Sequence, residues 1–201
     1  MLFGKKSAEQ VDELRLSLAR QSARASFYQA QFDEKLFSNL VENELSDEFK
    51  HSLRHFQKLI SKAVFNGTWS VEEELVLIEQ YLLLAQMRLG IAKVDFNVRR
   101  ITEKTFSIQI RPLSILPLLQ NAVHTGFNSP VLRPIKCAIQ ISEQHMLVDV
   151  SNQVNPYIVD QNGTWLMECY RSALEHYYPK RSRLFTNSNT NRFKASLQLD
   201  L

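Results

Sequence analysis

The apolar residues of the first ninety positions repeat at helical spacing. Near the N-terminus the intervals are three, four or seven residues, formed by Val11, Leu14, Leu18, Ala25, Tyr28 and Phe32. This narrow seam is typical of a coiled coil that leads into a helical bundle. A second helix is predicted from the apolar set Leu53, Phe56, Leu59, Ile60 and Val64, and Asn66-Gly67 is expected to end it.

A third helix is predicted to begin at Ser70. Ser70 and Glu73 have the spacing of a capping box, in which each side chain accepts a hydrogen bond from a free backbone N–H of the first turn. Gly90 is expected to end this helix. One apolar stripe follows the start, made of Val71, Leu75, Ile78, Leu82, Ala85 and Leu89. Such stripes form cores or helix interfaces, so we expect the N-terminal helices to assemble a parallel or bundled homodimer.

After Gly90 the pattern changes to alternation, which predicts strands. The expected strands cover 94–98, 106–110, 137–141, 146–150 and 192–201, with Glu143-Gln144 in a turn and Asn, Ser and Thr residues in another at 186–191. Helices are expected at roughly 113–125 and 163–178. The chain is therefore predicted to have a helical region over 1–90 and an α/β two-layer sandwich over 91–201.

Composition and charge narrow the functional classes. The 201 residues carry a net charge of only +3, which does not by itself indicate nucleic-acid binding. No apolar run reaches the roughly 18 residues of a membrane span, and no signal peptide is evident. Cys137 and Cys169 lack metal-ligand spacing and favour a reducing cytoplasm.

Basic residues gather near the C-terminus, beside two phenylalanines. They form either a solvated hairpin face or a patch for nucleic acid or an acidic partner. The set comprises Lys180, Arg181, Arg183, Arg192 and Lys194, with Phe185 and Phe193.

Four segments carry a resemblance to one family. They are Gln31 to Asn39 (QFDEKLFSN), Ser70 to Gly90, Ile110 to Val123 (IRPLSILPLLQNAV) and Val148 to Asn152 (VDVSN). The first resembles Q-I-N-P-H-F-L-F-N, and the third resembles I-P-P-L-L-L-Q-P-L-V-E-N-A-I. Together they are similar to the LytS/YehU-type sensor histidine kinases. The resemblance implies a helical dimerisation and phosphoacceptor region followed by a GHKL-type ATPase sandwich with a mixed sheet.

The residues that carry the chemistry of that family differ here. Lys35 stands where the family has its phosphoacceptor histidine, and Asp33-Glu34 replaces Asn-Pro before it. A neutral imidazole is nucleophilic near neutral pH, whereas a lysine with a pKa of about 10.4 is almost wholly protonated. We therefore expect Lys35 to be a solvated surface residue.

The implied nucleotide pocket is altered as well. Gln120-Asn121 replaces Glu-Asn, so the implied Mg²⁺ ligand Asn121 remains, but the amide of Gln120 cannot accept a proton as a carboxylate can. Asn152 can still accept a hydrogen bond from an adenine amino group, while Val154 replaces a glycine. Gly163 is the single glycine in a stretch expected to be glycine-rich, and Asn189-Thr190-Asn191 replaces Gly-Gly-Thr.

These differences favour a degenerate histidine-kinase-like module in a two-component-type pathway. We expect it to dimerise, to need no cofactor, and to dock onto a response regulator, an intact kinase or a membrane sensor. Residual Mg-ATP binding at Gln120, Asn121, Asn152 and Gly163 is the alternative within the same resemblance.

Two further alternatives stay open. His51 and His55 lie four residues apart on the second helix, so one of them could act as a phosphotransfer relay or as the acceptor of a residual kinase. The two histidines could also bind a metal ion, but the carboxylate of the H-E-x-x-H motif is absent beside them. A helical adaptor whose sandwich only stabilises it is the structural alternative.

Overall fold

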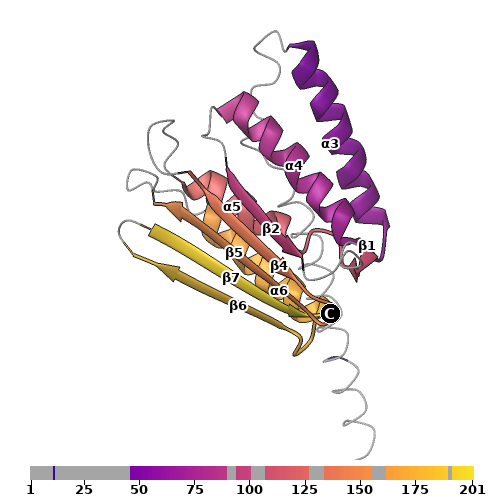
Figure 1. Ribbon diagram of the computed structural model, residues 1–201, viewed down its shortest axis with the longest axis vertical. Coiled ribbons are helices and arrows are strands. Elements are labelled where there is room, and N and C mark those ends of the chain that lie inside the picture. Colours follow the sequence, from indigo (N-terminus) through magenta and orange to yellow (C-terminus); the bar gives the residue numbers. More distant parts are fainter. Residues whose placement is uncertain are drawn as a thin grey trace, which may run out of the picture.

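The computed structural model describes residue 11 and residues 46–89, 94–100, 107–126, 134–154, 162–189 and 192–201. Apart from Val11, the residues of the predicted N-terminal seam lie outside the described part of the chain, and so does Lys35. The elements, in chain order, are α3 (Asp47–Phe65), β1 (Trp69–Ser70), α4 (Val71–Leu89), β2 (Asp95–Arg100), β3 (Gln109–Ile110), α5 (Leu116–Thr125), β4 (Lys136–Ile141), β5 (His145–Gln153), α6 (Asn162–Tyr177), β6 (Ser182–Ser188) and β7 (Arg192–Asp200) (Figure 1).

Helices α3 and α4 begin at side-chain caps. The backbone N–H of Phe49 donates to Ser46 Oγ at 3.2 Å at the start of α3, and the helix ends at Phe65, beside the predicted Asn66-Gly67 break. The predicted capping box of α4 is confirmed, because Ser70 N donates to Glu73 Oε2 at 2.7 Å and Glu73 N donates to Ser70 Oγ at 3.2 Å. Local sequence therefore defines these helix starts.

Helix α4 is buried on a wider surface than one stripe. Leu77, Tyr81 and Leu84 are fully buried in addition to most of the predicted positions. The helix contacts α3 along one side and α5 along another. Phe56 of α3 packs against Tyr81, with ring centroids 6.1 Å apart. Packing on two sides explains why one amphipathic stripe did not account for the helix.

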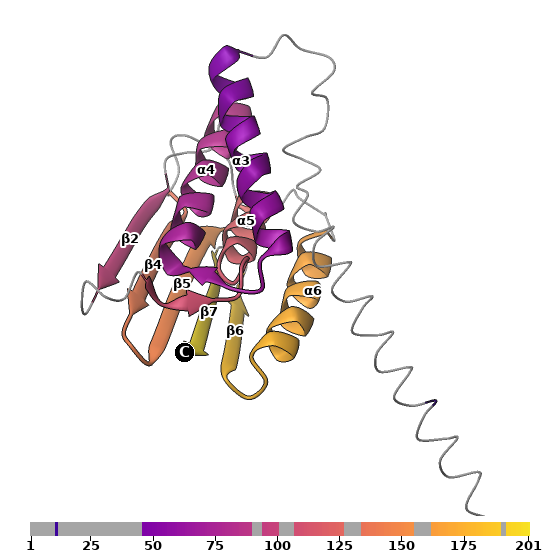
Figure 2. The same ribbon diagram turned by 90° about the vertical axis from the view of Figure 1, so that its right-hand side faces the viewer.

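The five-stranded sheet has the order β2-β4-β5-β7-β6. The β2 and β4 strands are parallel, and every other neighbouring pair is antiparallel. Helices α5 and α6 lie on one face of this sheet (Figure 2). Alternating buried residues point toward them, including Ile139, Val148 and Leu197. The predicted α/β two-layer sandwich with a mixed sheet is confirmed.

Two strand predictions need correction. The expected strand 106–110 is reduced to β3, which pairs with β1 in a separate two-stranded sheet. Strand β6 was not predicted and occupies part of the expected 186–191 turn. It lies at the sheet edge, and none of its residues is buried, so its sequence lacks the apolar alternation that identifies a half-buried strand.

The hydrophobic core is continuous between the two helices and the sandwich. One buried cluster contains residues of α3 and α4 together with residues of the sheet, α5 and α6. The domain boundary after residue 90 stays a prediction. Within the described residues, none of the helices combines the length and apolar character that a bilayer crossing needs.

Candidate functional site

A fully buried carboxylate, that of Glu74 on α4, holds the loop that precedes α5. Its Oε1 accepts hydrogen bonds from the backbone N–H groups of Ile115 at 2.8 Å and Leu116 at 3.1 Å. Its Oε2 accepts from Leu113 N at 2.8 Å and from the indole Nε1 of Trp69 at 3.0 Å. The carboxylate thus satisfies N–H groups at the start of α5 that lack a partner within the helix.

The electrostatics of Glu74 combine two opposing effects. Complete burial raises the pKa of its carboxyl, whereas the four donors favour the charged form and counter this rise. Leu113 has a left-handed backbone conformation with φ of 65°. A leucine rarely adopts this conformation, and the hydrogen bond from its N–H to Glu74 helps to hold it there.

Two tyrosines bind the same loop from the α6 side. The hydroxyl of Tyr170 donates to the carbonyl oxygen of Ser114, and Ser114 Oγ lies 3.0 Å from the Tyr178 hydroxyl. The backbone N–H of Arg111 donates to that Tyr178 hydroxyl at 2.8 Å. Burial raises the pKa of both tyrosines, so both hydroxyls keep their protons at neutral pH. The start of α5 is therefore fixed between α4 and the α6 segment.

Sequence reasoning missed Glu74, although a signal was present. The residue falls at helical spacing with Ile78, Tyr81 and Ala85, which are all buried. An acidic residue at such a position must find hydrogen-bond donors inside the protein. The donors could not be read from the sequence, because those on the loop lie 39 to 42 residues further along the chain.

The predicted nucleotide residues lie on two neighbouring elements. Gln120 and Asn121 are on α5 with exposed fractions of 1% and 2%, and Asn152 near the end of β5 is 3% exposed. The Nδ2 of Asn152 donates to the carbonyl oxygen of Gln153 at 3.2 Å. The buried Oδ1 of Asn152 has no hydrogen-bond partner among the described residues. Gly163 lies in the first turn of α6, and the surroundings of that turn fall outside the described side chains.

A backbone bridge connects the ends of these two elements. Gly126, directly after α5, forms an isolated antiparallel bridge with Val154, directly after β5. A Cβ atom on Gly126 would lie 2.5 Å from the carbonyl oxygen of Ala122 and 3.5 Å from Asn152 Nδ2. The backbone therefore approaches so closely that only glycine fits at residue 126.

The candidate relay histidines lie apart from this region. His51 and His55 are both exposed on α3. Among the described residues, no group of three or more His, Cys, Asp and Glu side chains has a metal-binding arrangement.

Comparisons with known proteins give only structural neighbours. No family model and no curated protein matches the sequence. Among solved structures, one nucleotide-free crystal form of the catalytic domain of histidine kinase ThkA is similar at 13% identity and a TM-score of 0.47, covering 66% of this chain and 93% of that one. Another nucleotide-free form of that domain has 12% identity and a TM-score of 0.47, covering 66% of this chain and 95% of that one. The Acinetobacter baumannii histidine kinase AdeS gives 9% identity and 0.43, covering 88% and 95%. At these values the similarity says nothing of this chain's activity.

Proposed function

We propose that this protein is a histidine-kinase-like signalling module that acts by docking to a partner and not by phosphoryl transfer. The observation that carries the proposal is the burial of Asn121 and Asn152 beside the bridge between Gly126 and Val154. The resemblance implies that a bound nucleotide would contact Asn152 through its adenine and Asn121 through its Mg²⁺. Both side chains are buried, so a nucleotide could not reach them.

The chemistry of the side chains supports the same proposal. The Gln120 amide offers no carboxylate that could act as a base, and an amide oxygen is a weaker Mg²⁺ ligand than a carboxylate. Val154 places a branched side chain in the turn after β5. The resemblance to the LytS/YehU-type kinases implies a glycine at this position. These differences weaken nucleotide binding while leaving the hydrophobic core intact.

The framework around α5 supports retention of the fold for a binding role. The Glu74 carboxylate and the two tyrosines hold the α5 start through hydrogen bonds that have no part in phosphate chemistry. In the proposed mechanism, binding of this protein shifts the conformational equilibrium of its partner, which is a response regulator or an intact kinase in the cytoplasm. Dimerisation through the N-terminal helices belongs to this proposal.

The test measures Mg-ATP binding by calorimetry and label transfer from radiolabelled ATP on the purified full chain. We expect neither, together with stable binding of a receiver domain or an intact kinase. A double variant, Gln120→Glu with Val154→Gly, should gain nucleotide affinity if these two residues are the obstacle. Micromolar Mg-ATP binding and label uptake by the unaltered protein would overturn the proposal.

One observation favours a second candidate, a phosphotransfer relay. His51 and His55 are exposed one turn apart on α3, beside the exposed cations Lys50, Arg54 and Lys58. These cations could attract a phosphorylated receiver.

The relay has its own assay. Acid-labile phosphate passing from a phosphorylated receiver to this protein, and lost in His51→Ala or His55→Ala, would establish it. His176→Ala is the matched control, since His176 is an exposed histidine on α6. No transfer, or equal transfer in all variants, would exclude it.

A further inference from the structure

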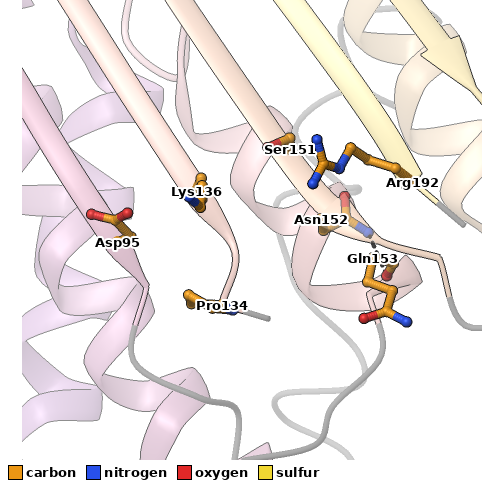
Figure 3. Close-up of a pocket in the computed structure, with 7 residues that line it drawn as sticks. All are labelled: Asp95, Pro134, Lys136, Ser151, Asn152, Gln153 and Arg192. Carbon is orange, nitrogen blue, oxygen red and sulfur yellow. Dashed lines mark hydrogen bonds between the residues drawn. The ribbon is translucent and has the colours of Figure 1, made fainter. Parts of the chain in front are cut away.

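One end of the sheet contains a pocket that the proposed docking function does not use. Its volume is about 330 Å³, and it spans the ends of β2, β4, β5 and β7 (Figure 3). The polar residues at its wall are Asp95, Lys136, Ser151, Asn152, Gln153 and Arg192. A hollow of this size can enclose a small organic molecule.

The register of the strands places the cations of this pocket on the face of the sheet that carries no helices. Lys136 is the Cα partner of Ser151, and Arg192 is the Cα partner of Gln153. These residues alternate with buried neighbours such as Cys137 and Val150, which point toward α5 and α6. The pocket is therefore distinct from the region between α5 and the end of β5, although Asn152 borders both.

The two cationic side chains of this pocket have no partners among the described residues, unlike the charged side chains elsewhere on the same face. Further along the sheet, Lys194 Nζ lies 3.2 Å from Asp149 Oδ1, and His145 Nδ1 lies 3.0 Å from Asp200 Oδ1. Within the part of the chain that the structure describes, no ion pair or side-chain hydrogen bond involves Lys136 or Arg192.

The remaining wall residues share this property. Among the described contacts, the side chains of Asp95, Ser151 and Gln153 also form no hydrogen bond. Charged and polar groups that border one hollow without partners of their own remain available to a ligand.

We propose that this pocket binds a phosphorylated small molecule that also carries hydroxyl groups, with the chemistry of a sugar phosphate. The ammonium of Lys136 and the guanidinium of Arg192 flank β5. Their two positive charges match a phosphate dianion better than a ligand whose only charge is one carboxylate. The carboxylate of Asp95 accepts only, so it selects hydroxyl donors on the rest of the ligand.

The test uses glucose 6-phosphate, glucose and inorganic phosphate as probes in calorimetric titrations of the full chain without magnesium. We expect glucose 6-phosphate to bind more tightly than either of the other two. Lys136→Ala and Arg192→Ala should each weaken that binding by about tenfold or more, because each removes a charge-assisted hydrogen bond. Arg183→Ala is the matched control, since Arg183 is exposed on β6 away from this pocket, and it should leave the affinity unchanged.

Three results would overturn the proposal. The first is no binding of glucose 6-phosphate at millimolar concentration. The second is an equal loss of glucose 6-phosphate affinity in Arg183→Ala and Arg192→Ala, which would mean that only diffuse charge attraction holds the ligand. The third is binding of an acidic protein that depends on the same two cations, with no small-molecule affinity. None of these results bears on Mg-ATP binding near Asn121, so this inference and the proposed function can fail separately.

Discussion

Replacing Glu74 by glutamine tests how the α5 start is held. The substitution keeps the size of the side chain but exchanges one acceptor oxygen for an NH₂ group. Each carboxylate oxygen accepts two of the four hydrogen bonds. Whichever oxygen is replaced, two buried N–H groups lose their acceptor and face another donor.

The expected loss of stability follows from these contacts. A buried donor without a partner costs about 1–3 kcal/mol, so two donors cost roughly 2–6 kcal/mol. The amide recovers part of this loss, because an uncharged group avoids the desolvation that raises the pKa of the Glu74 carboxyl. We expect a net decrease of about 2–4 kcal/mol in the free energy of unfolding and a fall in Tm of about 4–16 °C.

Urea unfolding followed by tryptophan fluorescence measures this change, and Trp69 is a reporter in direct contact with Glu74. Glu72→Gln is the matched control, because Glu72 is exposed on the same first turn of α4 and undergoes the same loss of charge. We expect that control to change stability by less than about 0.5 kcal/mol. Trp69→Phe removes one of the four donors and leaves the carboxylate with three, so it should cost about 1 kcal/mol from the lost hydrogen bond. Because this variant lacks the Trp69 reporter, its unfolding is followed by circular dichroism.

Equal stability of Glu74→Gln and Glu72→Gln would refute the reasoning. It would mean that the loop before α5 is held by apolar packing alone, and that the carboxylate adds no net free energy. A large loss in Glu74→Gln with intact β-sheet signal in circular dichroism would instead confirm a local role at the α5 start.

Three further predictions test other parts of the fold. The hydrogen bonds from Lys62 and Ser70 lower the pKa of Glu73 below 4.5. The charged Glu73 side chain therefore stabilises the fold above pH 4.5, and this contribution is lost as the pH falls through the lower folded pKa. Glu73→Gln should cost about 0.5 kcal/mol at pH 7, and urea titrations should show the stability difference between variant and unaltered protein vanishing in acid. Burial raises the pKa of Cys137 to about 12, so Ellman's reagent should label this thiol only after unfolding, and rapid labelling of the native protein would contradict its burial. The Arg171 guanidinium binds the backbone and a hydroxyl of edge strand β6, so Arg171→Ala should increase self-association in light scattering, whereas a strictly unchanged particle size would exclude edge protection.

Much of the secondary structure could be predicted because its signals are local. The capping box joins residues three apart, and both of its hydrogen bonds form as expected. Strand β7 buries Ala195, Leu197 and Leu199 in the predicted alternation. In contrast, the edge strand β6 has little to bury, so nothing in its sequence marked it as part of the sheet.

The candidate sites could be predicted only in part. The sequence placed Gln120 and Asn121 on a helix and Asn152 at a strand end, and the structure brings the ends of these elements together. Nothing in the sequence indicated that charged and polar residues of four strands would line one hollow, because strand order and register determine that arrangement.

Sequence by itself determined where α4 begins and which residues of β4, β5 and β7 face the core. Tertiary structure alone decided that Glu74 would serve the start of α5 and that Lys136 and Arg192 would share a pocket. The physical reason is range. Capping and periodicity act between residues a few positions apart, whereas a buried carboxylate or a pocket depends on groups that only folding brings together.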